Sequence, residues 1–442
     1  MVTLPEQHIT DGIVELVVSQ SVLGEVKVKG TSWSKPEAIA DMIRQTPGEP
    51  IDERALIEQV GFVGRHPFRE AEVIYAPGQE PLTTDVEVIV KDSKPVRVYL
   101  GSENTGLRQI SRWRNFLGIN WGNVFGTGDI LSFQCAAAPN PKRFRAYTFN
   151  YTHLFSTRQI IQLFGGYAHA HSEPIENIAR TTGYSLQVSS RYDLPLDSGV
   201  KWRHGLIFGT DFKRMNSNLE FTTLDIADEH HNVNLTQLLV GYTGGLERSK
   251  VQFEWTLDVI ASPGGWLPDQ KNSDYGALRP GAHPTYALSH VDLSALIVLP
   301  ANFQLLTSVR SQGTLRALLP SEQIGIGGHD SVRGYEEREF TADMGIITNV
   351  ELKSPPMKLI RSKPTWRDAL HMLIFFDHGA GRNHRIVPGL PKARYLMSAG
   401  PGMRYTIGEH FSVRFDVGFR LHDEPSPSKF KTLPNFGIIA LF

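Results

Sequence analysis

Residues 411–422 alternate without exception between two kinds of side chain. Every odd position, from Phe411 to Leu421, is apolar, and every even position carries Ser, Arg, Asp, Gly or His. Because successive side chains of a strand point to opposite faces, this pattern predicts a strand with one apolar and one polar face. The pattern recurs through the rest of the chain after about residue 96. Such recurrence is typical of a sheet closed into a barrel, with lipid outside and water inside.

Sixteen alternating runs follow Lys94, and clusters of Gly, Pro, Asn and Asp separate them. An even number of strands is usual in single-chain bacterial outer-membrane barrels. A soluble propeller is the alternative, but it would repeat every 40–50 residues or so, and no such period is found. We therefore predict a transmembrane barrel of sixteen antiparallel strands. The runs lie near residues 96–103, 113–121, 129–138, 143–154, 159–171, 181–193, 202–215, 234–247, 249–262, 284–299, 303–316, 343–355, 369–382, 394–407, 411–422 and 435–442.

The first 95 residues have a different pattern. A first strand is expected at 12–20. Ser34, followed by Pro36 and Glu37, is a helix-start signal for a helix that ends near Thr46, and a second helix is expected from Asp52 to about Gly64. Two helices with three further strands predict a small α+β domain, in which the helices cover one face of a short sheet. Those three strands are expected at 23–29, 69–76 and 83–91.

Composition excludes several classes of protein. The chain has 45 Lys and Arg against 46 Asp and Glu, whereas nucleic-acid binding favours a basic excess, so no nucleic-acid partner is expected. No apolar run approaches the roughly 20 residues of a spanning helix. The single Cys135 cannot form an internal disulfide. The first residues, Met1 to Gln7, lack the features of a secretory signal, which an outer-membrane protein needs, so we expect an N-terminal truncation.

Three segments match a known family. Residues 324–335 read Ile-Gly-Ile-Gly-Gly-His-Asp-Ser-Val-Arg-Gly-Tyr, residues 375–379 read Phe-Phe-Asp-His-Gly, and the chain ends in Phe442. Together they resemble the TpsB transporters of two-partner secretion, the hemolysin/hemagglutinin secretion-activation proteins of the BamA–TpsB superfamily. In that family a POTRA pair precedes a sixteen-stranded barrel. The loop after the eleventh strand folds into the pore with Val-Arg-Gly-Tyr at its tip, and Phe-x-Asp-x-Gly faces the lumen on the thirteenth strand. The matching residues are Val332, Arg333, Gly334 and Tyr335, and Phe375, Asp377 and Gly379.

The resemblance also implies a division into domains. Residues 1–21 resemble the remnant of a first POTRA domain, and residues 22–95 resemble the second, with substrate-binding residues somewhere within it. The signal peptide, plug helix and most of the first POTRA domain of the family are missing from the sequence. Residues 96–442 are then the barrel, with residues 317–342 as the loop folded into it.

The chemistry of Arg333 suits an anchor for such a loop. A guanidinium offers a rigid fork of donors that can meet a carboxylate with two hydrogen bonds, and Asp377 is the acceptor that the resemblance implies. Gly334 permits unusual backbone angles at a tight tip, and Tyr335 can pack against the wall. In a water-filled lumen we expect the pair to be screened and to contribute no more than about 1–3 kcal/mol. The alternative is a solvated loop arginine and an ordinary lumen carboxylate.

The remaining candidate residues carry weaker signals. His169, His171 and the run Glu229-His230-His231 lack the spacing of a metal site, so we expect no metal. Phe442 resembles the assembly signal that the barrel assembly machinery reads, although it could be a chance apolar terminus. No Gly-x-Ser-x-Gly or phosphate loop occurs, so neither an enzyme nor a cofactor is expected.

The resemblance implies a translocase in the bacterial outer membrane, surrounded by lipid and with its POTRA domain in the periplasm. Its substrate would be a secreted exoprotein of the TpsA type, which passes from the periplasm to the cell surface. Two alternatives stay open from sequence. One is an insertase of the BamA type that assembles other barrels, and the other is a passive porin-like channel.

Overall fold

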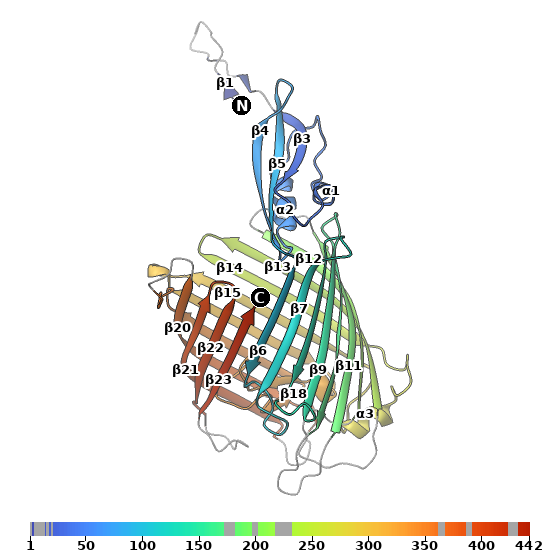
Figure 1. Ribbon diagram of the computed structural model, residues 1–442. Coiled ribbons are helices and arrows are strands. Elements are labelled where there is room, and N and C mark those ends of the chain that lie inside the picture. Colours follow the sequence, from blue (N-terminus) through green and yellow to red (C-terminus); the bar gives the residue numbers. More distant parts are fainter. Residues whose placement is uncertain are drawn as a thin grey trace. The chain divides into compact units, whose positions relative to one another are not determined.

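The computed structural model describes residues 2–3, 14, 17–18, 21–171, 182–196, 202–216, 232–360, 367–385, 391–422 and 432–442. The chain divides into two compact units. The first comprises residues Met1–Val96, Trp121–Leu131 and Thr152–Ile160, and the second comprises Arg97–Asn120, Ser132–Tyr151 and Ile161–Phe442. Figure 1 shows the order of the elements within each unit.

A small α+β fold occupies most of the first unit. In its three-stranded sheet the central strand β5 pairs in parallel with β3 and antiparallel with β4. Buried residues of the sheet, such as Val86 and Val88, pack against Ile39 and Leu56 of the two helices, which are themselves buried. The elements follow the predicted order of strand, helix, helix, strand, strand. They are β3 (Val22–Lys29), α1 (Pro36–Ala40), α2 (Glu53–Val63), β4 (Arg69–Pro77) and β5 (Thr83–Asp92).

Helix α1 is shorter than the sequence predicts. It ends at Ala40 instead of near Thr46, and its N-cap is Lys35, without a side-chain cap, instead of Ser34. The segment that follows makes other hydrogen bonds: the Arg44 N–H donates to the Gln59 side chain. The Ser34 N–H donates to Asp92. The contact with Gln59 satisfies the Arg44 N–H, which a longer helix would have paired internally.

The predicted strand at 12–20 lies mostly outside the described residues. Of its length the structure describes residue 14 and residues 17–18. The latter form β2 (Val17–Val18), which pairs with β1 (Val2–Thr3) as a short two-stranded sheet.

The largest part of the chain forms a closed barrel, in which β6 to β16 and β19 to β23 form one continuous ring (Figure 1). The prediction of sixteen strands is confirmed, and each predicted run falls on one barrel strand within a few residues. The strands are β6 (Val96–Glu103), β7 (Arg114–Val124), β8 (Asp129–Ala137), β9 (Phe144–Leu154), β10 (Ile160–His171), β11 (Thr182–Pro195), β12 (Trp202–Asn216), β13 (Asn232–Arg248), β14 (Val251–Ser262), β15 (Tyr286–Val298), β16 (Gln304–Thr314), β19 (Met344–Lys353), β20 (Asp368–Arg382), β21 (Ala393–Ile407), β22 (Phe411–Arg420) and β23 (Thr432–Leu441).

Alternation along each strand separates the two faces of the barrel. In β22, Phe415 and Phe419 are exposed on the outer face, while Asp416 is buried on the inner face. An apolar outer face with a polar interior suits a barrel surrounded by lipid. None of the described helices has the length and the hydropathy that crossing a membrane requires. The helices between barrel strands are α3 (Asn272–Leu278), η1 (Pro300–Asn302) and η2 (Pro320–Glu322).

One connection folds into the barrel. Residues 317–342, called the inner loop below, link β16 to β19 and contain the short antiparallel pair β17 (Ile324–Ile326) and β18 (Phe340–Ala342). Its apolar residues pack against the barrel wall in one buried cluster, which includes Ile347 of β19 and Leu396 of β21. The loop members of that cluster are Ile326, Val332, Tyr335, Phe340 and Ala342.

Candidate functional site

The inner loop is held at its tip by Arg333 and Asp377. The Nε–H and Nη2–H groups of Arg333 donate to the two carboxylate oxygens of Asp377, each over 2.7 Å. The backbone N–H of Arg333 donates to the same carboxylate over 3.1 Å. Asp377 lies on β20, the thirteenth barrel strand, so the structure brings together the two residues that the family motif pairs. The fork geometry fixes both the position and the orientation of the tip.

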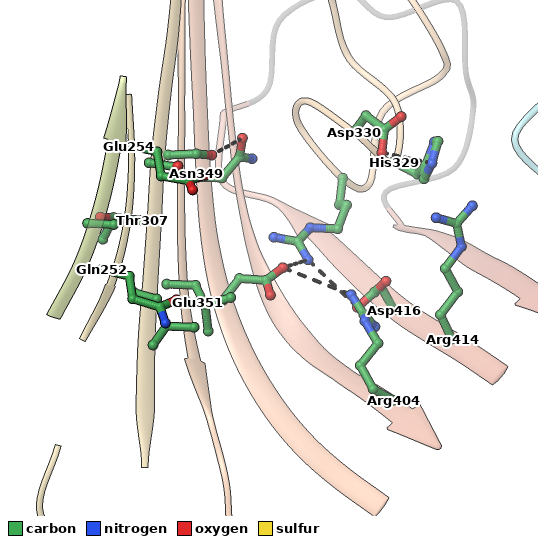
Figure 2. A pocket seen from close by; sticks show the side chains of 16 residues that line it. Gln252, Glu254, Thr307, His329, Asp330, Asn349, Glu351, Arg404, Arg414 and Asp416 are labelled. Atoms are coloured by element: carbon green, nitrogen blue, oxygen red, sulfur yellow. Dashed lines mark hydrogen bonds and ion pairs between the residues drawn. The ribbon is translucent and has the colours of Figure 1, made fainter. Parts of the chain in front are cut away.

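Two further carboxylates face the same guanidinium. Arg333 Nη1 lies 2.5 Å from Glu351 Oε1 and 3.7 Å from Asp416 Oδ1. Arg404 contacts the same two acids, at 3.9 Å from Glu351 and 2.8 Å from Asp416 (Figure 2). Two cations therefore face three anions, Asp377 included. This cluster, called the tip clamp, carries a net negative charge before any bound ion is considered.

The tip clamp borders a charged cavity of about 480 Å³. Figure 2 shows that its side chains come from several strands of the wall and from the inner loop. Its charged or titratable lining residues are Glu254, His329, Asp330, Arg333, Glu351, Arg404, Arg414 and Asp416.

The other residues of the Phe-x-Asp-x-Gly motif have steric roles. The Phe375 ring lies under the guanidinium of Arg333, with 3.5 Å between the guanidinium carbon and the ring centroid. Gly379 leaves room for the loop, because a Cβ there would come within 2.5 Å of Ile326 and 2.9 Å of Val332. The inner face of β20 thus supplies, at alternate positions, an aromatic ring under Arg333, a hydrogen-bond acceptor for Arg333 and space for the inner loop.

Gly334 and Tyr335 complete the tip. Gly334 has a φ of +88°, which L side chains rarely adopt, and a Cβ there would lie 2.7 Å from the carbonyl oxygen of Gly418 on β22. The Tyr335 hydroxyl donates to the carbonyl oxygens of Met397 and His422, both over 3.1 Å. The tip therefore contacts the backbone of the wall as well as its side chains.

The expectation of a screened pair in open water is wrong. Arg333 is 3% exposed and Asp377 is fully buried at 0%. Packing of the loop against the wall excludes water from both groups. Breaking a buried pair by removing one partner costs about 3–5 kcal/mol, more than the sequence-based estimate, because it leaves an uncompensated charge.

A second cluster, which the sequence analysis did not predict, holds the base of the inner loop. Asp343 is fully buried and accepts two hydrogen bonds from Arg279, which follows α3, at 2.5 and 3.0 Å. The backbone N–H groups of Leu318 and His384 donate to it over 3.0 and 2.9 Å, and the Gln323 side chain donates over 3.2 Å. This base clamp joins the two ends of the inner loop to the loops that follow β14 and β20.

Two residues that the sequence analysis missed could have been found from the pairing of the predicted strands. Asn349 lies directly opposite Asp377 in the β19–β20 register, and Glu351 lies opposite Phe375. Both therefore share the inner face of the motif, so the predicted strands, once paired, would have pointed to them. Arg279 had no such signal, because it lies in a connection between strands.

Among the remaining predicted residues, those that the structure describes do not line the cavity beside the tip clamp. The Phe442 side chain is 72% exposed, while its backbone N–H donates to Val98 O over 2.8 Å, next to the first barrel strand's start. His169 and His171 lie on β10, and Glu229, His230 and His231 lie outside the described residues. Within the described part of the chain, no group of three or more His, Cys, Asp or Glu side chains could hold a metal ion.

Comparison with known proteins assigns the chain to a family. Residues 83–405 match the family model of the haemolysin secretion/activation protein ShlB/FhaC/HecB. The heme/hemopexin transporter protein HuxB of Haemophilus influenzae (strain 86-028NP) is 20% identical over 94% of this chain and 72% of its own length. The outer membrane transporter CdiB-2 of Burkholderia pseudomallei (strain 1026b) is 22% identical over 80% of this chain and 61% of its own length.

Solved structures agree in fold. The structure of CdiB from Escherichia coli matches with a TM-score of 0.82 at 16% identity, over 100% of this chain and 80% of that one. The family model covers well over half of the chain, and it matches the part that contains the inner loop, the motif strand and most of the barrel. The chain therefore belongs to the haemolysin secretion/activation protein family ShlB/FhaC/HecB, as a TpsB-type outer-membrane transporter of two-partner secretion.

Proposed function

We propose that this chain secretes a partner exoprotein from the periplasm to the cell surface through the interior of its barrel. The substrate would arrive unfolded and thread through as an extended chain. Folding on the far side would then trap it there, so that no cofactor and no covalent chemistry are needed. Lipid surrounds the apolar outer face in this proposal.

The observation that carries the proposal is the position of the inner loop, which packs inside the barrel. A loop that packs along the wall and is pinned by Arg333 occupies space in the barrel interior that a passing chain needs. The tip clamp is built of ion pairs and hydrogen bonds beside a polar cavity, so water and ions can replace those contacts when the loop leaves its seat. We expect the loop to rearrange during passage and to return afterwards.

Residues 22–95 would act as a POTRA domain in the periplasm, and residues 1–21 as the remnant of another. The sheet order β3-β5-β4 leaves β3 and β4 as its two edges, where an extended segment could add as a further strand. In this mode the main chain of the substrate supplies the contacts, which suits an unfolded partner. Docking in a groove beside a helix is the other mode.

Phe442 would serve in assembly of the barrel. Its ring is exposed at the end of the last strand, where the barrel assembly machinery could reach it before the strands close. Removal of the ring should slow insertion of the barrel and leave secretion by the inserted fraction unchanged.

Secretion through proteoliposomes tests the proposal. The full chain is reconstituted, unfolded exoprotein is added outside, and protected exoprotein is measured after protease treatment. Wild type should protect the exoprotein, and Arg333→Ala should reduce protection by about tenfold or more, because the loss of a buried pair changes the loop's conformational balance. Arg333→Lys should be intermediate, since an ammonium lacks the two-pronged fork.

A matched control is Arg203→Ala, because Arg203 pairs with Glu254 at 2.5 Å but both side chains are more than half exposed. It should secrete like wild type. Flux of small solutes without protected exoprotein would instead indicate a passive channel. Folded barrels appearing in the bilayer would indicate an insertase.

A further inference from the structure

The barrel interior contains a second cavity with a different chemistry. It is lined by residues of β6 and of β8 to β11 and, like the charged cavity, has a volume of about 480 Å³. Of the described residues that line it, none is Asp, Glu, Lys, Arg or His. This cavity is called the neutral groove. Its lining includes Tyr99, Gln134, Thr148, Asn150, Phe164 and Gln187.

Strand register places the groove on the inner face. Glu103 of β6 pairs at 2.7 Å with Arg414, which lines the charged cavity, so Glu103 faces the interior. Tyr99 lies four residues earlier on the same strand and shares that face. The Tyr99 hydroxyl donates to Gln134 Oε1 over 3.0 Å, which puts β8 residue Gln134 on the inner face as well.

Small residues hollow out the groove. Ala146, Gly166 and Ala168 line it. A Cβ at Gly166 would come within 2.9 Å of the Tyr147 carbonyl oxygen and 3.1 Å of Thr148. The aromatic rings of Tyr99 and Phe164 lie among these small side chains as flat apolar surfaces. A guanidinium does lie over the Phe164 ring, that of Arg191, but Arg191 is paired with Asp211 at 3.0 Å.

The lining chemistry fits an extended peptide backbone of any sequence. Amide side chains both donate and accept hydrogen bonds. Gln134 accepts from Tyr99 through Oε1 and Gln187 donates to Ser189 through its NH2 group, so the Gln134 NH2 group and the Gln187 Oε1 atom can pair with backbone groups of either kind. Aromatic rings accept apolar side chains. The absence of fixed charge among the lining residues means that neither acidic nor basic segments would be repelled. The charged cavity lacks this tolerance because charged side chains line it. Two of its carboxylates, Glu351 and Asp416, already face Arg333 of the inner loop.

We propose that the neutral groove is the surface along which an extended polypeptide slides through the barrel. The inference rests on the proposed secretion function and adds the wall that the substrate touches. The charged wall then serves to seat the inner loop, and the neutral wall to carry the passing chain. Division of the interior in this way keeps the substrate from competing for Arg333.

Photocrosslinking with defined peptides tests this division. A photoreactive amino acid is placed at Thr148 in the neutral groove, at Ser308 in the charged cavity, or at exposed Val188, which lines neither cavity, in the full chain in detergent. Unstructured peptides of equal length are added that are neutral (Gly, Ser, Asn, Thr), rich in Glu, or rich in Lys. All three should label Thr148 within about threefold of one another, and about tenfold more than the other two positions.

Added charge should destroy this tolerance. With the crosslinker at Thr148, Gln187→Glu should reduce labelling by the Glu-rich peptide about tenfold and leave the neutral peptide unchanged, because like charges repel at short range. Ser294→Glu, in the charged cavity, is the matched control and should change neither. Heat-modifiable migration on gels confirms that each variant is folded, and Asn150→Asp replaces Gln187→Glu if the latter fails that check.

The outcomes separate cleanly. Strongest labelling at Ser308, equal labelling at all three positions, or crosslinks to the chain itself at Thr148 would each overturn the neutral groove as the peptide path. None of these results depends on secretion, which is measured separately with exoprotein in proteoliposomes. Loss of peptide labelling at Thr148 with secretion intact removes this inference alone, and absence of secretion in wild type removes the proposed function.

Discussion

The two ends of the inner loop are held by opposite arrangements of charge. At the tip, the loop supplies the cation, Arg333, and the wall supplies three carboxylates beside a polar cavity. At the base, a single carboxylate, Asp343, accepts five hydrogen bonds from Arg279, Gln323 and two backbone N–H groups. The tip places three carboxylates around one loop guanidinium and adds one backbone N–H donor, that of Arg333. The base pairs one carboxylate with one guanidinium and adds backbone N–H donors from two chain segments.

The difference indicates two tasks. A contact made mainly of side chains beside a polar cavity can open and close, since water can solvate the separated groups. A contact that satisfies buried backbone N–H groups from two chain segments has no such substitute, and its loss leaves those groups unpaired. We therefore interpret the base clamp as a structural hinge and the tip clamp as the releasable contact.

The largest effect should come from the base. Asp343→Ala leaves the buried Arg279 without its carboxylate, and we expect the free energy of unfolding to fall by about 3–5 kcal/mol. Urea unfolding of the full chain in detergent measures it. Asp343→Asn keeps one acceptor oxygen and should lose only about half as much. A loss below about 1 kcal/mol for the alanine variant would contradict the structural role.

Coupling at the tip should be smaller but specific. In a double-mutant cycle with Arg333→Gln and Asp377→Asn, we expect a coupling of up to about 3 kcal/mol, read from hydrogen exchange of the inner-loop amides. Additive effects would show that the two residues act separately. Exchanging the two charges would be a poor test, because an aspartate at 333 would face Glu351 and Asp416.

Packing of the loop against the wall gives the next effect. Gly379→Ala puts a Cβ within 2.5 Å of Ile326, which should cost about 2 kcal/mol and raise hydrogen exchange in β17 and β18. Gly276→Ala in α3 is the matched control, because no atom lies within 4 Å of its Cβ position. Equal exchange in the two variants would show that the loop is not seated on Gly379.

The smallest effect should come from Asp92, which like Asp343 accepts hydrogen bonds from several backbone N–H groups. It accepts backbone N–H groups from Ser32, Trp33 and Ser34 over 2.8, 3.0 and 2.7 Å, on the surface of the α+β fold. Burial alone would raise the pKa of Asp92, but these N–H donors outweigh it and the pKa lies below its ordinary value. Asp92→Ala should destabilise this fold by about 1 kcal/mol.

The sign of the pH dependence follows from that direction. The folded state favours the ionised carboxylate, so its stabilisation is present above an unfolded pKa of about 4 and is lost as pH falls through the folded pKa. Hydrogen exchange of residues 22–92, corrected for intrinsic rates, should show the wild type converging on Asp92→Ala as the pH falls below 4 or so. Glu72→Gln, on the sheet edge, should show no such convergence.

The sequence alone predicted the barrel and its motif strand, because alternation is a local property that survives without knowledge of any contact. It placed Asp377 and Gly379 on one face, and the resemblance to the transporter family implied that Arg333 lies at the tip of a loop. It missed the early end of α1 and the burial of the tip, because both depend on contacts made by distant residues, such as Gln59 with Arg44 and Phe375 with Arg333.

Only the tertiary structure decided which charges meet. Arg279 and Asp343 are separated by 64 residues. Arg333 lies in the inner loop, whereas Asp416 lies on β22. Cross-strand register and the path of the inner loop bring them together, and neither is encoded in the spacing of residues along the chain. The same holds for the neutral groove, whose character appears only when five strands, β6 and β8 to β11, present their inner faces.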